Sequence, residues 1–386
     1  MPTTRSAVKG VAPTHDGISE SAGSKHQIKD KTSPTSKRVR KDSNDKKEQK
    51  TLEETIPSSN NENGNDESDS RAEDDAKAAE DNEGESSNTK EQPEQQDSAE
   101  KPTARGDIVP SNILEKGLIY FFFRGRIGID EPSDVNEIAR SYFILRPLAK
   151  EAKLGEGTIG DAGNSRLVAV PKKVFPLSGR DRWIAFVEKS DASFKSLKDD
   201  FLASSDYSTK TAGVRHKPAA TPAAEGIYAI TTTGRESHLA YMITLPSDLG
   251  EVQLELGLRE KGSFIITTRN PQYEAPKGTA LPSGPEYPKE VQDEFRALRW
   301  MPSQPKHLDY VNTQFLLVGE SSGIAKATEP QKEDQDDNKE EPREEMEKLE
   351  DEDTHRMEGL EGDDSAAIFA DLHAQSKDYP KLQTTF

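Results

Sequence analysis

The sequence predicts an α+β protein with a β-rich core, a mixed or antiparallel sheet with short helices, and long disordered arms on both sides. The first observation is that no aromatic residue precedes Tyr120, and both tryptophans follow it. The second is that most Phe and Tyr residues lie between Tyr120 and Phe315, in short apolar runs separated by turn residues. Because burying large rings offsets the conformational entropy lost on folding, a long leader without rings is a poor candidate for a packed core.

Charge divides the chain in the same places. Residues 1–50 carry a net charge of about +6, residues 51–101 about −13 and residues 329–386 about −13, which leaves about +1 for the middle. With 32% charged and 6% aromatic residues, much of the length is not core. We therefore predict a disordered arm over residues 1–107, basic and then acidic, a globular domain over 108–322, and an acidic, mostly disordered tail over 323–386.

The middle segment alternates between strand and turn signals. Short apolar runs bounded by Gly, Pro or polar residues predict strands at residues 117–124, 142–147, 166–170, 182–187, 226–230, 238–245, 263–268 and 313–318. Apolar residues at helical spacing, with end signals at the last segment, predict short helices at 193–202, 251–258 and 288–298. Residues 132–140 form either a short helix or a long hairpin loop.

The two halves of this domain, 108–222 and 223–322, resemble each other. A Gly-Leu-Ile-Tyr run at 117–120 and a Gly-Ile-Tyr run at 226–228 each open a strand. Each is followed about 20 residues later by an aliphatic strand that ends in proline, at Pro147 and Pro246. A tandem duplication would produce such a similarity between the two halves. The alternative is that two strand starts look alike because strands share residue types, and both interpretations stay open.

Composition excludes several classes of site. The chain has no cysteine, which excludes disulfides, thiolate metal sites and cysteine nucleophiles. No apolar run approaches the roughly 20 residues that cross a bilayer, and the N-terminal residues lack the apolar core of a signal peptide. None of the histidines has a zinc-binding spacing, and no phosphate-binding P-loop occurs. We expect an intracellular, soluble protein without a metal or a cofactor.

Two catalytic patterns occur by letter, and their context argues against both. Residues 155–160 spell the dinucleotide fingerprint GxGxxG, which requires a strand before the glycines and a helix after them. Polar residues precede them and another strand follows, so a surface loop is the better interpretation. Residues 319–323 spell the nucleophile elbow GxSxG, but the chain beyond breaks into Pro330 and an acidic tail where the acid and histidine would be needed. We predict no catalytic residue.

Arginines beside the apolar strands are candidates for a ligand site. If several of them converged, their forked guanidinium groups would bind a small anion, with a histidine as a titratable neighbour. The candidates are Arg124, Arg146, Arg269, Arg299 and His238, with His307 as a second histidine. The alternative, which we favour, is that each arginine pairs with one of the core carboxylates and each histidine is a structural group.

A compact basic cluster in the N-terminal arm is typical of nuclear-import signals. Its members are Lys37, Arg38, Arg40, Lys41, Lys46 and Lys47. Because the cluster stands apart from the acidic block that follows, we expect it to be accessible to an import receptor. In the tail, Ile368, Phe369 and Leu372 lie on one face of a potential helix, which would dock either on a partner or on the core.

Several segments of the core resemble a family of filamentous-fungal proteins that is often labelled BTB domain transcription factor. They are residues 119–124, 142–147, 225–230, 238–246, 269–271 and 295–318, together with the opening Met-Pro-Thr-Thr-Arg-Ser. The last segment includes the Arg-Trp-Met-Pro run at 299–302 and the Leu-Asp-Tyr run at 308–310. The resemblance implies a nuclear protein associated with transcription, and it implies no catalytic residues.

Two functions of different classes follow from these observations. The first is a nuclear, non-enzymatic regulatory protein that binds a protein partner through its folded module and is associated with transcription or chromatin. Its basic arm would add weak, non-specific, salt-sensitive contacts to nucleic acid. The second is a small-anion-binding protein or an enzyme that uses the core arginines and His238 or His307. A concave pocket with arginines pointing inward favours the second function, and a flat apolar patch favours the first.

Overall fold

The computed structural model describes residues 99–100, 109–211, 213–275, 281–331, 339–360 and 364–386. All of them belong to one compact unit, Ser86–Phe386. The predicted arm over residues 1–107, with its import cluster, lies outside the described residues except for Ala99–Glu100. That pair forms strand β1, which pairs with β4 (Lys153–Leu154).

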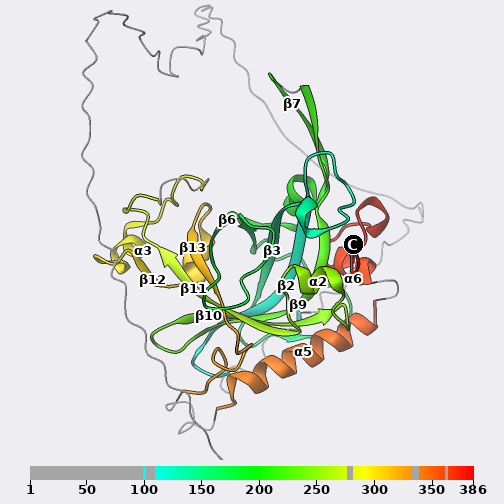
Figure 1. Ribbon diagram of the computed structural model, residues 1–386. Coiled ribbons are helices and arrows are strands. Elements are labelled where there is room, and N and C mark those ends of the chain that lie inside the picture. Colours follow the sequence, from blue (N-terminus) through cyan, green and yellow to red (C-terminus); the bar gives the residue numbers. More distant parts are fainter. Residues whose placement is uncertain (1–98, 101–108, 212, 276–280, 332–338, 361–363) are drawn as a thin grey trace, which may run out of the picture. The chain divides into compact units, whose positions relative to one another are not determined.

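Eight antiparallel strands close into a barrel (Figure 1). Around the ring their order is β2, β3, β5, β6, β13, β11, β10, β9 and back to β2, and β12 (Trp300–Pro302) pairs with β11 outside the ring. This confirms the predicted β-rich core. The closure of the sheet into a barrel was not predicted. The barrel strands are β2 (Ile113–Gly125), β3 (Ile138–Leu148), β5 (Ser165–Val170), β6 (Arg182–Ala192), β9 (Thr221–Thr232), β10 (Ser237–Leu245), β11 (Lys261–Arg269) and β13 (Gln314–Gly319).

The order of the strands reveals two four-stranded meanders. The first is β2-β3-β5-β6, and the second is β9-β10-β11-β13. Pairing of β2 with β9 and of β6 with β13 joins the meanders on both sides. The second meander therefore runs around the ring in the opposite sense from the first, as a two-fold axis across the barrel would place it.

Both faces are buried along nearly the whole length of β2, β5 and β9. Successive side chains of a strand point to opposite faces, so in β2 Ile119 and Phe121 join the interior cluster while Leu118 and Tyr120 join the outer cluster. All four side chains are fully buried. The continuous apolar run of this segment is explained by this double burial, because a half-exposed strand would alternate apolar and polar residues.

Aromatic side chains fill the barrel interior. The ring of Phe121 lies 5.2 Å from Tyr241 and 5.3 Å from Phe175, both edge to face, and Tyr241 stacks on Phe264 at 5.4 Å. An eight-stranded barrel is just wide enough for side chains to fill. The interior is thus a packed core, and the barrel serves as a scaffold.

Short segments close the two ends of the interior. Val252 of α2 (Glu251–Glu255) and Leu308 of η5 (Pro305–Asp309) both belong to the interior cluster. Beside η5, Arg166 pairs with Glu115 at 2.6 Å and with Asp309 at 2.6 Å. Charged groups at this end are therefore neutralised by one another.

The C-terminal segment covers the outer face, which corrects the predicted disordered tail over 323–386. Its described residues form α5 (Pro342–Glu358), α6 (Asp364–Asp371) and η6 (Ser376–Asp378). The side chains that they add to the outer cluster are Ile324, Ala327, Met346, Leu349, Ile368, Phe369 and Leu372. The apolar face noted at 368–372 thus docks on the core of its own chain. Figure 1 shows α5 lying beside β9 and β10.

Helix α5 was not predicted from its acidic sequence, although the placement of its charges stabilises the helix. The helix starts with Pro342, carries Glu344 and Glu345 in its first turn and Arg356 in its last, an order that suits the helix dipole. Its buried residues are few and include charged ones, because those charges have partners on the barrel.

The other predicted elements form close to their expected positions. All of the predicted strands are present, and the predicted helices appear as α1 (Phe194–Leu197) with the π-turn η4 (Lys198–Leu202), α2, and α3 (Lys289–Glu294). Between β2 and β3, the segment left open contains a single turn of 3-10 helix, η3 (Val135–Glu137). Within the described part of the chain, none of the helices has the length and apolar character needed to cross a membrane.

Candidate functional site

The predicted anion-binding arginines are held in separate places. Arg124, at the end of β2, is buried and donates to the backbone carbonyls of Pro218 and Phe201. Its guanidinium also lies 5.3 Å from the ring of Phe201, and burial lowers the pKa of Arg124. Its donors are thus directed at the protein itself.

Arg146 of β3 is also committed to its own surroundings. It donates to the carbonyl of Gly160 and to the side chain of Asn164, and its guanidinium lies 5.5 Å from the ring of Phe194. These contacts hold the GxGxxG loop against the barrel. No helix follows the glycines, so the loop interpretation of residues 155–160 is confirmed.

Arg269 and Arg299 approach each other around Tyr273. Arg269 is buried and donates to Gln314 at 2.7 Å and to the carbonyl of Tyr273. Arg299 is exposed and lies 5.2 Å from the ring of Tyr273. Burial and the neighbouring Arg299 both lower the pKa of Arg269. Among the described residues, this pair is therefore separate from Arg124 and Arg146, and the four do not form one anion pocket.

His238 lies in a buried contact with a carboxylate. Its Nδ1 is 2.7 Å from Oε2 of Glu320, and Ser263 donates to the same oxygen at 2.6 Å. Burial alone would raise the pKa of Glu320, but the hydrogen bonds from His238 and Ser263 lower it. Because Ser263 donates to the carboxylate and not to the histidine, the three side chains do not form a nucleophile–base relay.

His307 is a packed, neutral side chain. It stacks on Phe295 at 5.5 Å, and burial lowers the pKa of His307 to about 4. Its Nδ1 lies 3.2 Å from the hydroxyl of Thr268. At neutral pH this imidazole carries no charge, so it would not attract an anion.

The strongest concentration of buried charge is a cluster around Arg356, hereafter the Arg356 cluster. The guanidinium lies 3.0 Å from Glu225 of β9, 2.6 Å from Asp353 of α5 and 2.6 Å from Asp371 of α6. These four side chains are fully buried. Tyr120 of β2 donates to Asp371 at 3.2 Å. One cation thus ties α5, α6 and the barrel together.

The Arg356 cluster holds more carboxylates than cations. Burial, with Asp371 and Asp353 nearby, raises the pKa of Glu225 well above its ordinary value, and Arg356 offsets this in part. Burial also raises the pKa of Asp353. Oε2 of Glu225 has no hydrogen-bond partner among the described residues, and the nearby carboxylate of Asp371 favours a protonated Glu225. The cluster therefore joins the C-terminal helices to the barrel through one buried cation and three carboxyl groups.

Protonation of Glu225 predicts how stability changes with pH. Because the folded-state pKa is raised, this stabilisation is complete below the ordinary glutamate pKa and is lost as pH rises through the folded-state value. We expect Glu225→Gln, which mimics the protonated form, to reduce the fall in unfolding free energy as pH rises above the ordinary glutamate pKa. Urea denaturation at a series of pH values measures the unfolding free energy of wild type and variant. Glu347→Gln is the control, because that carboxyl on the surface has a lowered pKa. If the unfolding free energy fell equally steeply with pH in wild type and in Glu225→Gln, the prediction would be wrong.

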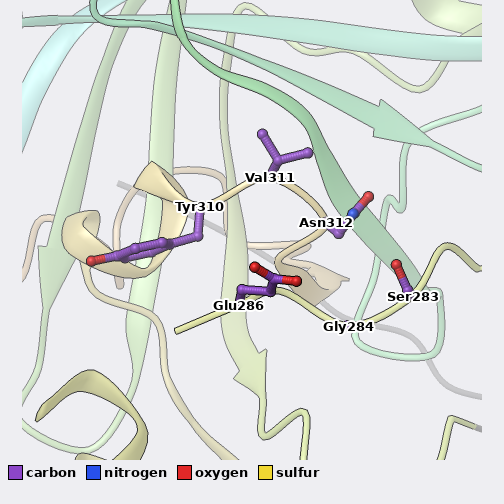
Figure 2. Close-up of a pocket in the computed structure, with 6 residues that line it drawn as sticks. All are labelled: Ser283, Gly284, Glu286, Tyr310, Val311 and Asn312. Carbon is purple, nitrogen blue, oxygen red and sulfur yellow. The ribbon is translucent and has the colours of Figure 1, made fainter. Parts of the chain in front are cut away.

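A pocket of about 220 Å³ lies on the outside of the barrel. Figure 2 shows the carboxylate of Glu286 between Tyr310 on one side and Asn312 on the other. Ser283, Gly284 and Val311 complete the lining. We call this the Glu286 pocket.

Two loops form the Glu286 pocket and are anchored to strands. The carbonyl of Pro282 accepts from the side chain of Gln314 at 2.9 Å, which fixes one loop to β13. In the other loop, Asn312 has a φ of 67°, in the left-handed region that asparagine tolerates well, and its N–H donates to Val187 at 2.8 Å. The side chains of the pocket are therefore carried by backbone that is held at both loops.

The Glu286 pocket presents one group that only accepts hydrogen bonds, the carboxylate of Glu286, beside side chains of Ser283, Tyr310 and Asn312 that donate or accept. A carboxylate accepts only, and an asparagine carbonyl and a serine oxygen add further acceptors. Such a lining suits a ligand that brings donors and positive charge. Sequence reasoning missed these residues because they lie in separate loops; only Tyr310 was noted, as part of the family resemblance.

The fold and the pocket define a class of protein: a filled antiparallel β-barrel, clamped by its C-terminal helices, with a small pocket beside Glu286 outside the barrel. No family model matches the chain, and neither a curated protein nor a solved structure does.

Proposed function

We propose that this chain is a nuclear, non-enzymatic protein-interaction module with a regulatory role in transcription or chromatin. We further propose that its Glu286 pocket receives a basic side chain of the protein partner. The observation that carries the proposal is the position of the pocket, outside a barrel whose interior is already filled. A filled barrel leaves its surface for recognition.

The size of the pocket supports a side chain as its ligand. Pockets for small molecules and cofactors measure roughly 300–1,000 Å³ and enclose most of the ligand. The Glu286 pocket has about 220 Å³, and Ser283, Glu286 and Val311 around it are exposed. An open space of this size suits one residue of a larger partner.

The charge of the pocket supports a basic side chain. Lysine and arginine offer only donors, and they complement a carboxylate with neighbouring acceptors. A charge-assisted hydrogen bond contributes about 1.5–3 kcal/mol, which is about tenfold or more in affinity. Loss of the Glu286 charge should therefore weaken partner binding by about tenfold without altering the fold.

Quantitative affinity purification from nuclear extract tests this role with the full chain as bait. We expect a reproducible set of proteins with wild type and with Glu290→Gln, an exposed carboxylate on the neighbouring helix α3. Glu286→Gln should retain about tenfold less of that set. Equal retention by both variants would remove the pocket from the proposal, and the absence of any reproducible partner would remove the interaction role.

The nuclear part of the proposal rests on the basic cluster of the N-terminal arm and an import receptor as its partner. Imaging of a fluorescent full-length fusion checks it, with the cluster residues changed to glutamine as the comparison. Accumulation in the nucleus that persists in the changed chain would contradict an import role for the cluster.

We also infer that the two meanders arose by tandem duplication, halves 108–222 and 223–322. Gly117 and Gly226 support this: a Cβ at Gly117 would lie 2.1 Å from the carbonyl of Arg146, and one at Gly226 would lie 2.0 Å from that of Met242. Each glycine permits the same close approach of the next strand of its meander. Superposition of 113–192 on 221–319 checks the inference, and a best fit that places these glycines out of register contradicts it.

A further inference from the structure

A two-stranded ribbon extends from the barrel at one end of the molecule (Figure 1). It consists of β7 (Ser205–Thr209) and β8 (Gly213–Lys217), which pair with each other and with no other described strand. Most of its residues are exposed, including the large apolar side chains of Tyr207 (41%) and Val214 (73%). Exposed apolar side chains on a projecting ribbon contribute nothing to the barrel core.

The pairing register gives the ribbon two different faces. Directly opposite residues share a face, and alternate residues of a strand take opposite faces. The first face, hereafter the basic face, carries the pairs Tyr207 with Arg215 and Ser205 with Lys217. The second face carries the pairs Asp206 with His216 and Ser208 with Val214.

The second face is fixed to the barrel at its base. Nδ1 of His216 lies 2.6 Å from Asp206, and Nε2 lies 3.0 Å from Asp130 in the loop after β2. The N–H of Gly128 in that loop donates to the carbonyl of His216 at 3.0 Å. With this face turned toward the loop at its base, the basic face is turned away from it.

Positive charge on the ribbon is not neutralised locally. Lys210 at the tip, Arg215 and Lys217 form no ion pair within the described residues, and the one ribbon carboxylate, Asp206, is taken by His216. Lys210 and Arg215 are exposed, whereas Lys217 at the base is half-buried, and burial together with the nearby Arg124 lowers the pKa of Lys217. The sequence carries a formal net charge of −19, so an unpaired basic element stands out from the whole. A tyrosine among unpaired cations is the composition of a nucleic-acid contact.

We propose that the β7–β8 ribbon binds double-stranded DNA by entering the major groove with its basic face. The B-form major groove, about 12 Å wide, admits a two-stranded β-ribbon. The deep, narrow major groove of A-form RNA does not admit it, so the geometry points to DNA. Arg215, Lys217 and Lys210 contact phosphates, and Tyr207 lies among the base edges. This site is independent of the Glu286 pocket and of the basic N-terminal arm.

Fluorescence anisotropy with a 20-base-pair duplex, titrated with salt, tests the proposal on the full chain. In the ribbon variant, Lys210, Arg215 and Lys217 become glutamine. Each lost phosphate contact reduces the slope of log affinity against log salt by about 0.9, so the slope should fall by roughly 2–3. The matched control changes three exposed cations elsewhere, Lys306, Arg343 and Lys348, to glutamine and should keep the wild-type slope.

Tyr207→Ala distinguishes the contribution of a groove contact to DNA binding from that of the positive charge, because it leaves the charge unchanged. We expect it to weaken DNA binding several-fold at constant salt slope, while Ser208→Ala on the second face leaves binding unchanged. An unchanged slope in the ribbon variant, with binding abolished by glutamines in the N-terminal cluster, would assign DNA binding to the arm and overturn the proposal. Loss of polyglutamate binding in the ribbon variant with unaltered DNA affinity would make the ribbon a contact for acidic protein, and would overturn it too.

Discussion

A chain that ends at Glu329 is expected to lose cooperative unfolding and to aggregate. Removal of the segment that follows exposes the outer face of the barrel, including Leu118 and Tyr120, which are fully buried in the whole protein. It also removes five large apolar side chains, each contributing about 1.5–3 kcal/mol through burial, or roughly 7–15 kcal/mol together. They are Met346, Leu349, Ile368, Phe369 and Leu372. Total stabilities of domains are about 5–15 kcal/mol, so the shortened chain should not stay folded.

Urea denaturation followed by circular dichroism checks this expectation, with the full chain as reference. Dye binding to exposed apolar surface provides a second readout, since a collapsed state would bind the dye and a folded barrel would not. Addition of a separate 339–386 peptide should restore part of the cooperative transition. A sharp transition at unchanged midpoint in the shortened chain would show that the barrel folds without its C-terminal cover.

Arg356→Met should destabilise the protein by about 3–5 kcal/mol, because removal of one partner from a buried ionic group leaves uncompensated charge. Here Asp353, Asp371 and Glu225 would all remain buried without their cation. The loss should be larger at pH 8 than at pH 5, since additional protons can neutralise these carboxylates at the lower pH.

Arg343→Met on the same helix is the matched control. Arg343 is exposed and pairs with Glu347 one helical turn away, so we expect a change of less than about 1 kcal/mol. Chemical denaturation of both variants at pH 5 and pH 8 measures the difference. If Arg356→Met proved as mild as Arg343→Met, the Arg356 cluster would not be the clamp described above.

Strand positions could be predicted because their signal is local. The run around Phe121 and the run around Phe143 are apolar, short and bounded by turn residues, and both form barrel strands. Closure could not be predicted in the same way. It depends on the pairing of β2 with β9, which joins Leu118 to Ile227 across a long stretch of sequence. The residue types of an apolar strand do not specify which of several other strands it will pair with.

Helix α5 was missed because its burial depends on distant partners, whereas the potential helix around Ile368 was identified. Glu345 and Arg356 read as solvated charges in an acidic segment, yet both are buried, against Lys116 at 2.8 Å and Glu225 at 3.0 Å. A helical stripe of Met346, Leu349 and Met357 was the available signal, and it is short. Among the predicted site residues, Arg124, Arg146 and Arg269 donate to backbone carbonyls or amide side chains that only the fold brings near.

Local sequence signals located the barrel strands, because each is an apolar run bounded by turn residues. What those strands enclose and what covers them follows from contacts that form only in the folded chain. Ring closure, the Arg356 cluster and the Glu286 pocket all join residues far apart in the chain. Their energies arise from desolvation and pairing between such residues, and these appear only when the chain is folded.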